Sequence, residues 1–419
     1  MKRRALLGVA ILVLSGCTAN GPLVRGAASP SPSFVSPSQE PSPSPSPSPT
    51  PSLSPVPSPA ALSISCSTTP SAAFEPLVLT WNPDQPQPPV LLNSLRDPAH
   101  PSTLCTIQGT YSVRFISATE IGYVTNSTLN NPAEGRSVIM RSSLTDLKPV
   151  AVASVQGQVM DLAWSPDGSS VAYLVYSSAP GLGSGNANQL WLKRGSSPPR
   201  ALTPLIPLYG RGGSISDENV VRFSPDGKYL LMVDTFVGTG PSASPDQARE
   251  MAPLQIRSVQ DGGFVWAAPS ALRASGKYQF ATMAVWLHQA DRLYYRDSMG
   301  VQTWDPPSID GTIYPGLAWY SPSISPDDRL VAYAVDLDAQ PHVEVRELAT
   351  KAIRVIPGIR GAPFFLSSNL LFVAEFAPST QYGPGVPPHS PNGRAVVIDL
   401  RTNVETPVPT LNPIDYWPR

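Results

Sequence analysis

A short repeated motif constrains most strongly how this chain can fold. Ser-Pro-Asp-Gly occurs at residues 165–168 and 224–227, and Ser-Pro-Asp-Asp occurs at 325–328. Each copy follows an apolar segment and precedes a run of β-branched and aromatic residues. Proline presets φ at the second turn position, serine and aspartate can bind nearby backbone amides, and glycine tolerates a positive φ. The motif therefore predicts a tight turn between two antiparallel strands, repeated along the chain.

Weaker copies of the same pattern fill the intervals between these turns. They lie at residues 114–124, 285–295 and 364–373, and each places two apolar strands around a short break. One anchor residue from each of the six copies recurs about every 50 residues, a spacing that suits one four-stranded blade plus its connections. We therefore predict an all-β fold, a six-bladed β-propeller of four-stranded antiparallel blades, with seven blades as the alternative. The six anchors are Phe115, Trp164, Phe223, Trp286, Ile324 and Phe365.

The repeats also resemble a known family. The Ser-Pro-Asp-Gly hairpins, with strands such as Val-Ala-Tyr at 171–173 and Leu-Trp-Leu-Lys at 190–193, resemble the TolB-type, WD-like propeller repeats of bacterial exported proteins. The resemblance covers about residues 105–410. It implies a β-propeller used mainly for protein association, and it carries over no catalytic residue. A different N-terminal region stands in place of the separate domain of TolB, so the partners of TolB are not transferred.

The N-terminus has the pattern of an export signal. A basic stretch at residues 2–4 precedes an apolar run at 5–14, which is too short to cross a bilayer as a helix. The run ends in Leu-Ser-Gly-Cys at 14–17, which resembles the lipobox of bacterial lipoproteins. The resemblance implies that residues 1–16 are a lipoprotein signal peptide and that Cys17 carries acyl chains such as palmitate, which anchor the protein extracytoplasmically to the bacterial cell membrane. The alternative is an ordinary secretory signal with an incidental cysteine.

Residues 17–61 are rich in proline and serine. The two residue types alternate without a break between Pro41 and Pro49. Proline fixes φ and removes a backbone donor, so we expect a disordered linker with polyproline II character rather than helix or sheet. We interpret this segment as a spacer between the lipid anchor and a folded domain at 62–419. A ligand for a proline-binding module is the alternative.

Two further cysteines lie at the start of the expected domain. Cys66 and Cys105 form an even pair, and such pairs usually oxidise outside the cytoplasm, so we predict a disulfide. Two free thiols are the alternative. The bond would pin residues 67–104, within the N-terminal extension 62–104, to the first blade. This extension has strand-like pieces at 77–81 and 90–92, which either supply a closing strand for the last blade or begin a seventh blade.

Long connections rich in Gly, Pro, Ser and Asn recur at one position of the repeat. If the Ser-Pro-Asp-Gly turn joins the first and second strands, these connections join the second and third strands on the opposite face. Several expanded loops on one rim are expected of a recognition surface, whereas tolerated insertions are the alternative. The connections are 126–136, 177–188, 236–253 and 377–393, and the side chains that we predict for binding there are Tyr209, Arg211, Tyr382 and His389.

Composition and motifs exclude several functions. The 29 basic and 30 acidic residues leave no basic field for binding nucleic acid. The histidines lack metal-ligand spacing and no Gly-x-Ser-x-Gly motif occurs, so we predict no cofactor, no metal and no catalytic residue. The favoured function is a membrane-anchored scaffold that binds a protein or a cell-envelope ligand. The alternative is an enzyme acting on envelope glycan or peptide, with carboxylates in a central funnel, because propellers host both functions.

Overall fold

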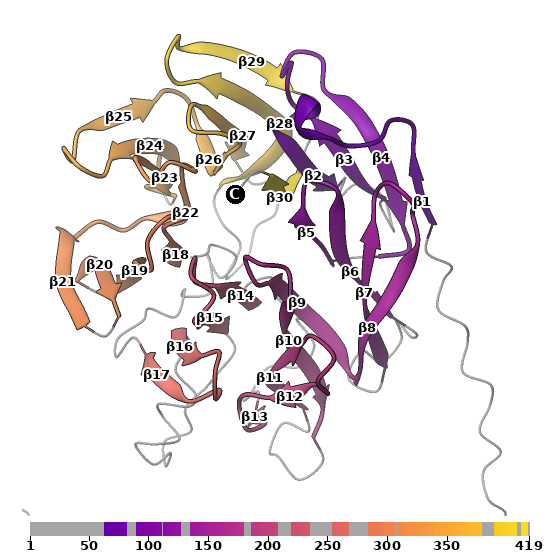
Figure 1. Cartoon of the computed structure of the whole chain (residues 1–419). Helices are drawn as coiled ribbons and strands as arrows, with labels where there is room; N and C mark the ends of the chain where they lie inside the picture. The colour runs from indigo at the N-terminus through magenta and orange to yellow at the C-terminus, as the bar shows by residue number, and fades with distance from the viewer. Residues whose placement is uncertain are drawn as a thin grey trace, which may run out of the picture. The chain divides into compact units, whose positions relative to one another are not determined.

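Seven antiparallel β-sheets surround a common axis in the described part of the chain (Figure 1). The predicted signal peptide and Pro/Ser linker, which include Cys17, lie outside the described residues. Within those residues the helical structure is a single 3-10 turn, Ala72–Phe74. No helix among them is long and apolar enough to span a membrane. This computed structural model describes residues 63–81, 89–110, 112–126, 135–179, 186–207, 219–234, 254–267, 284–297, 299–306, 308–337, 339–378, 389–408 and 412–417.

Six of the blades use strands that are consecutive in the chain. The innermost strand of each contains one predicted anchor, so these six blades lie where the repeat predicted them. From the axis outward, blade 2 consists of β5 (Ser112–Ser117), β6 (Glu120–Asn126), β7 (Arg136–Ser143) and β8 (Pro149–Gln156), and blade 3 of β9 (Gln158–Trp164), β10 (Ser170–Ser178), β11 (Asn186–Arg194) and β12 (Arg200–Ala201), with β13 (Ile206–Pro207) also paired to β11. Blade 4 consists of β14 (Asn219–Phe223), β15 (Tyr229–Asp234), β16 (Leu254–Ser258) and β17 (Phe264–Ala267), and blade 5 of β18 (Ala284–Trp286), β19 (Leu293–Asp297), β20 (Gly300–Asp305) and β21 (Ser308–Pro315). Blade 6 consists of β22 (Tyr320–Ile324), β23 (Leu330–Val335), β24 (His342–Glu347) and β25 (Ile353–Ile356), and blade 7 of β26 (Arg360–Phe365), β27 (Leu370–Pro378), β28 (His389–Asp399) and β29 (Val404–Val408).

Blade 1 closes the ring by joining the two ends of the described chain. Its innermost strand is the C-terminal one, and it pairs with the first strand of the N-terminal extension that follows the 3-10 turn. The extension therefore belongs to a seventh blade, one of the two alternatives left open by the sequence. From the axis outward, the strands are β30 (Asn412–Trp417), β2 (Leu77–Trp81), β3 (Val90–Ser94), β4 (Ser102–Gln108) and a fifth strand, β1 (Ser63–Cys66).

A disulfide joins the fifth strand of blade 1 to its neighbour. Cys66 in β1 and Cys105 in β4 are register partners, with 2.11 Å between the sulfur atoms and 4.0 Å between the Cα atoms. The bond closes a sequence separation of 39 residues. It therefore connects the strand that follows the predicted linker covalently to the ring.

The Ser-Pro-Asp-Gly segments form the predicted turns. The N–H of Gly168 donates to the carbonyl of Ser165 at 2.8 Å, and Gly168 has a φ of 67°. The carboxylate of Asp167 accepts the N–H of Ser169 at 3.0 Å. The second copy repeats this conformation, with Gly227 at a φ of 73°. Each turn thus satisfies its own backbone amides, which explains why these residue types occur at these positions.

Large apolar side chains fill the spaces between adjacent blades. Trp164 is 4% exposed and packs against Gly122 of blade 2, where an added Cβ would lie 2.0 Å from Trp164 Nε1. Trp286 packs between blades 4 and 5, and Trp319 between blades 5 and 6. Because every blade buries its faces against its neighbours, no blade has a complete core of its own.

Candidate functional site

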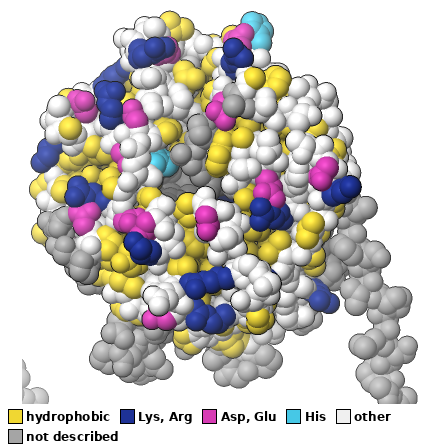
Figure 2. All heavy atoms as spheres, in the orientation of Figure 1, with side chains coloured by type: hydrophobic (Ala, Val, Ile, Leu, Met, Phe, Trp, Pro, Cys, Tyr) yellow, Lys and Arg dark blue, Asp and Glu magenta, His cyan; other side chains and the backbone are white. Residues whose placement is uncertain are grey.

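The innermost strands surround a hollow at the centre of the ring, which Figure 2 shows from one face. Basic and acidic side chains are scattered around this hollow rather than gathered into a patch of one sign. The inward edge of an innermost strand has no strand partner, so its backbone N–H groups need other acceptors. The side chains on this channel wall are therefore candidates for a functional site.

Polar side chains on innermost strands accept backbone N–H groups from the following blade. Asp161 Oδ2 on β9 accepts the N–H of Val221 on β14 at 3.0 Å. Ser323 Oγ on β22 accepts the N–H of Phe365 on β26 at 3.0 Å. In both pairs the acceptor stands on one blade and the donor on the next, so these contacts join successive blades around the channel.

Asp161 also binds two guanidinium groups from neighbouring blades. Arg114 on β5 donates to its Oδ1 at 2.7 Å, and Arg222 on β14 donates to its Oδ2 at 2.6 Å. Burial raises the pKa of Asp161, but the positive charges of Arg222 and Arg114 and the Val221 N–H outweigh it and hold the pKa below its ordinary value. Asp161 therefore stays ionised with both oxygens occupied, which does not suit a general base or a nucleophile.

A histidine and a tyrosine from non-adjacent blades meet at one mouth of the channel. The hydroxyl of Tyr416 on β30 lies 3.0 Å from Nε2 of His288, which follows β18 in blade 5. The same Nε2 lies 3.2 Å from the carbonyl of Ile324 in blade 6. The ring of Tyr416 packs edge-on against Phe364 of blade 7, with 4.9 Å between the ring centroids. This contact therefore joins blades 1, 5, 6 and 7 at the end of the ring that bears the first-to-second-strand turns.

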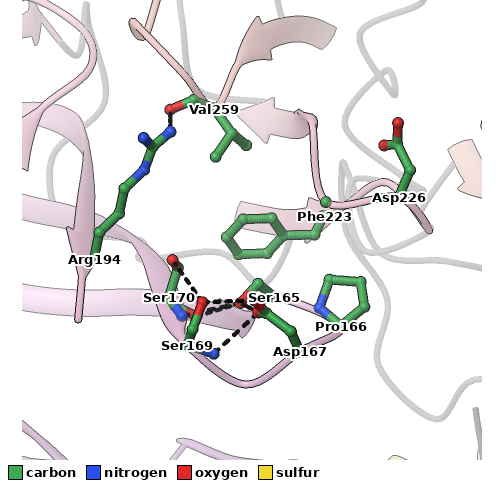
Figure 3. Close-up of a pocket in the computed structure, with 10 residues that line it drawn as sticks. Ser165, Pro166, Asp167, Ser169, Ser170, Arg194, Phe223, Asp226 and Val259 are labelled. Atoms are coloured by element: carbon green, nitrogen blue, oxygen red, sulfur yellow. Dashed lines mark hydrogen bonds between the residues drawn. The ribbon is translucent and has the colours of Figure 1, made fainter.

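A pocket of about 270 Å³ lies between blades 3 and 4, beside their first-to-second-strand turns (Figure 3). In Figure 3 the Phe223 ring forms one wall, and the guanidinium of Arg194 lies across from it, bonded to the carbonyl of Val259. The carboxylate of Asp167 is bound by Ser165 and by the next residues of its own turn, and these hydrogen bonds lower its pKa. The polar groups of this pocket thus serve the turn and the contact between blades.

Two carboxylates face each other between the turns of blades 4 and 5. Asp291 Oδ1 accepts the N–H of Asp226 at 3.0 Å, and Asp226 pairs with Lys228 at 2.5 Å. Burial raises the pKa of Asp226, but hydrogen bonds from Lys228 and Ser224 hold it at about 2. Burial and the adjacent Asp226 charge raise the pKa of Asp291. The pair lies in the turns rather than on the channel wall, and Asp291 takes up a proton first as the pH falls.

The structure covers one of the four predicted binding residues. Tyr209, Arg211 and Tyr382 lie outside the described residues. His389 begins β28 and is partly buried, and its Nδ1 has no hydrogen-bond partner among the described residues. The segment 208–218 lies between β13 and β14, so Tyr209 and Arg211 belong to a fourth-to-first-strand connection rather than to a second-to-third one.

The four predicted long connections do join second and third strands. They lie between β6 and β7, β10 and β11, β15 and β16, and β27 and β28. A fifth connection, between β2 and β3 of blade 1, has the same position and was not predicted. Fourth-to-first-strand connections leave from this same side of a propeller. We call this side the connection face; it bears the connections containing residues 82–88, 127–134, 180–185, 208–218, 235–253, 268–283 and 379–388.

Comparison with known proteins gives similarity of fold. No family model matches the chain, and no curated protein matches it. TolB from Acinetobacter baumannii is similar over 84% of this chain and 68% of its own, with 14% identity and a TM-score of 0.42. The β-propeller domain of the Trilobed protease from Pyrococcus furiosus covers 71% of this chain and 93% of its own, with 9% identity and a TM-score of 0.40. Oligogalacturonate lyase from Vibrio parahaemolyticus covers 75% and 94%, with 10% identity and a TM-score of 0.46. The class that the fold defines is a seven-bladed, four-stranded β-propeller.

Proposed function

We propose that this protein is a lipid-anchored, extracytoplasmic scaffold that binds a protein or a cell-envelope ligand through the connection face. The observation that carries the proposal is the gathering of the long connections on one face of the ring. A rigid framework that carries variable connections on one face is a common arrangement of recognition sites. The opposite face bears short turns that are occupied by contacts within and between blades.

The anchor is proposed from the sequence at residues 14–17 and is tested at Cys17. Cys17→Ala should move the protein from the membrane fraction to the soluble fraction and abolish incorporation of labelled palmitate, because the acyl chains would be lost. The double variant Cys66→Ala/Cys105→Ala is the matched control; it should stay in the membrane fraction and should still incorporate palmitate. Membrane retention and labelling of Cys17→Ala would contradict the anchor.

The recognition face is tested by shortening one connection. Pro378 and His389 are register partners at the ends of β27 and β28, so a two-residue Asn-Gly hairpin can replace residues 379–388. After chemical cross-linking in intact cells and purification of the protein, the shortened variant should lose partners that the unchanged protein retains. Lys228→Gln, on the opposite face, is the control and should retain them. Identical cross-linked partners for all three proteins would contradict a role for this connection.

Three carboxylates favour binding over the enzyme alternative. Asp161 on the channel wall has both oxygens occupied by donors from blades 2 and 4. The facing carboxylates of Asp226 and Asp291 lie between turns, outside the central funnel in which the enzyme alternative places its catalytic acids. We therefore retain the binding function as the proposal.

A further inference from the structure

One arginine on the channel wall, Arg222, uses only one side of its guanidinium group in contacts with the described residues. Arg222 donates to Asp161 at 2.6 Å and to the carbonyl of Val221 at 2.6 Å, both through Nη1. Its Nε and Nη2 have no hydrogen-bond partner among the described residues, and its side chain is 39% exposed. In a guanidinium these two nitrogens present parallel N–H groups, which bind two oxygens of a carboxylate or phosphate at once.

The exposure of Arg222 suits a ligand that arrives from solvent. Asp161 binds both Arg114 and Arg222, so its single carboxylate is shared between two guanidinium groups. The side chains of Asp161 and Arg114 are 5% and 13% exposed, whereas that of Arg222 is 39% exposed. An oxyanion can therefore reach Arg222 without displacing Asp161.

The Arg222 guanidinium is also held in place before any ligand binds. Hydrogen bonds from the N–H of Val221 at 3.0 Å and from Arg114 at 2.7 Å hold Asp161 in place. Asp161 in turn accepts a hydrogen bond from Nη1 of Arg222. A side chain that is already ordered loses little conformational freedom on binding. Strands of three successive blades supply these residues, so the closed ring sets the geometry of the arginine.

We propose that Arg222, positioned by Asp161 and Arg114, binds an oxyanion, a carboxylate or a phosphate group, through its Nε and Nη2 on the channel wall. The site is made by innermost strands and needs neither the long connections nor the lipid anchor. It therefore goes beyond the proposed function and can be tested independently of it.

Calorimetric titration of the full chain in detergent tests this site. Inorganic phosphate and citrate are the probes, each at constant ionic strength, and comparison of the two separates phosphate from carboxylate ligands. We expect the unchanged protein to bind at least one of them, and Arg222→Gln to weaken that binding by about tenfold or more, because a charge-assisted hydrogen-bond pair is lost. Arg222→Lys should be intermediate, since it keeps the charge but not the two-pronged geometry. Arg401→Gln, which alters a 70% exposed side chain in the β28–β29 turn, should bind normally.

Thermal unfolding of the same proteins separates a binding defect from misfolding. The bound anion should raise the Tm of the unchanged protein and leave that of Arg222→Gln unaltered. If Arg222→Gln does not fold, the contrast between Arg222→Lys and the unchanged protein provides the same test. Equal affinity in the unchanged protein and the Arg222 variants, or no binding of either probe by the unchanged protein, would overturn the proposal. Failure to capture a cross-linked partner would affect the proposed function alone.

Discussion

Asp415 accepts a hydrogen bond at 2.8 Å from the backbone N–H of Phe115, which precedes it by 300 residues in the chain. Phe115 stands on β5, the innermost strand of blade 2, and Asp415 on β30, the innermost strand of blade 1. The ring of Trp417 also packs against Phe115, with 6.4 Å between the centroids. The C-terminal strand thus joins the first two blades as well as completing one of them, so closure of the ring depends on it.

Removing the acceptor at Asp415 should weaken this closure. Asp415→Ala leaves the buried N–H of Phe115 without this carboxylate, so we expect the free energy of unfolding to fall by about 1–3 kcal/mol. Asp415→Asn keeps an acceptor oxygen and should lose less. Urea unfolding measures the stabilities, and hydrogen exchange should show faster exchange of the Phe115 amide in Asp415→Ala. Unchanged exchange at this amide would contradict the role of the contact.

Asp328 occupies the turn position that is glycine in the other two copies of the motif, and the contacts of its side chain explain why aspartate stands there. Its φ is 55°, a conformation in which glycine is less strained, but its carboxylate oxygens accept the N–H groups of His288 and Gln289 in blade 5, both at 2.7 Å. Asp328→Gly should lower the free energy of unfolding by about 2 kcal/mol, because two charge-assisted hydrogen bonds outweigh the relief of backbone strain. Asp328→Asn, which keeps one acceptor, is the matched comparison. Stabilisation by Asp328→Gly in a urea titration would show that the inter-blade bonds contribute less than the strain.

Asp161 should make the stability of the ring depend on pH. Its pKa is lowered in the folded protein, so its contribution is complete above the unfolded pKa of about 4 and is lost as the pH falls through the folded pKa. Asp161→Asn should lower the free energy of unfolding at neutral pH by about 3–5 kcal/mol, because it leaves two arginines without their carboxylate. Unfolding curves at several pH values should also show that acidification lowers the free energy of unfolding of Asp161→Asn by less than that of the unchanged protein. Asp146→Asn, on an exposed turn, is the control with little expected change. The same stability for Asp161→Asn and the unchanged protein at neutral pH would refute this account.

The disulfide between Cys66 and Cys105 should stabilise the N-terminal side of blade 1. Closing a separation of 39 residues corresponds to about 4 kcal/mol on the chain-entropy description of cross-links. Dithiothreitol should lower the urea midpoint of the unchanged protein towards that of Cys66→Ala/Cys105→Ala and leave the double variant unaffected. Two free thiols in the mass spectrum of the non-reduced protein would contradict the bond.

The parts of the fold that the sequence predicts are those made by local contacts. A Ser-Pro-Asp-Gly turn and its two flanking strands are continuous in the chain, so the residues of each motif are sufficient to predict them. β30 is different, because Asn412–Trp417 pairs with Leu77–Trp81, which lies at the other end of the domain in the sequence, and no Ser-Pro-Asp-Gly turn connects these two strands. No repeat marks such a strand. Its pairing follows only from the need of blade 1 for an innermost strand.

The candidate anion site could not be predicted from the repeat for a similar reason. Asp161 lies between Met160 and Leu162 in β9, and a lone carboxylate in an apolar strand does indicate a buried partner. Its two partners, Arg114 and Arg222, come from strands of the blades on either side. Which arginines meet the carboxylate depends on how successive blades pack, and the sequence of one blade does not contain that information.

The claim that recognition takes place on the connection face is tested most directly by photo-cross-linking from both faces. Benzoylphenylalanine replaces Tyr382 in the connection 379–388 of one protein and Lys228 in a turn of the other; the Lys228 side chain is 74% exposed on the opposite face. Both proteins are irradiated in intact cells and examined for covalent adducts. We predict adducts from position 382 and none above background from position 228. Adducts in equal yield from both positions, or from position 228 alone, would contradict the account.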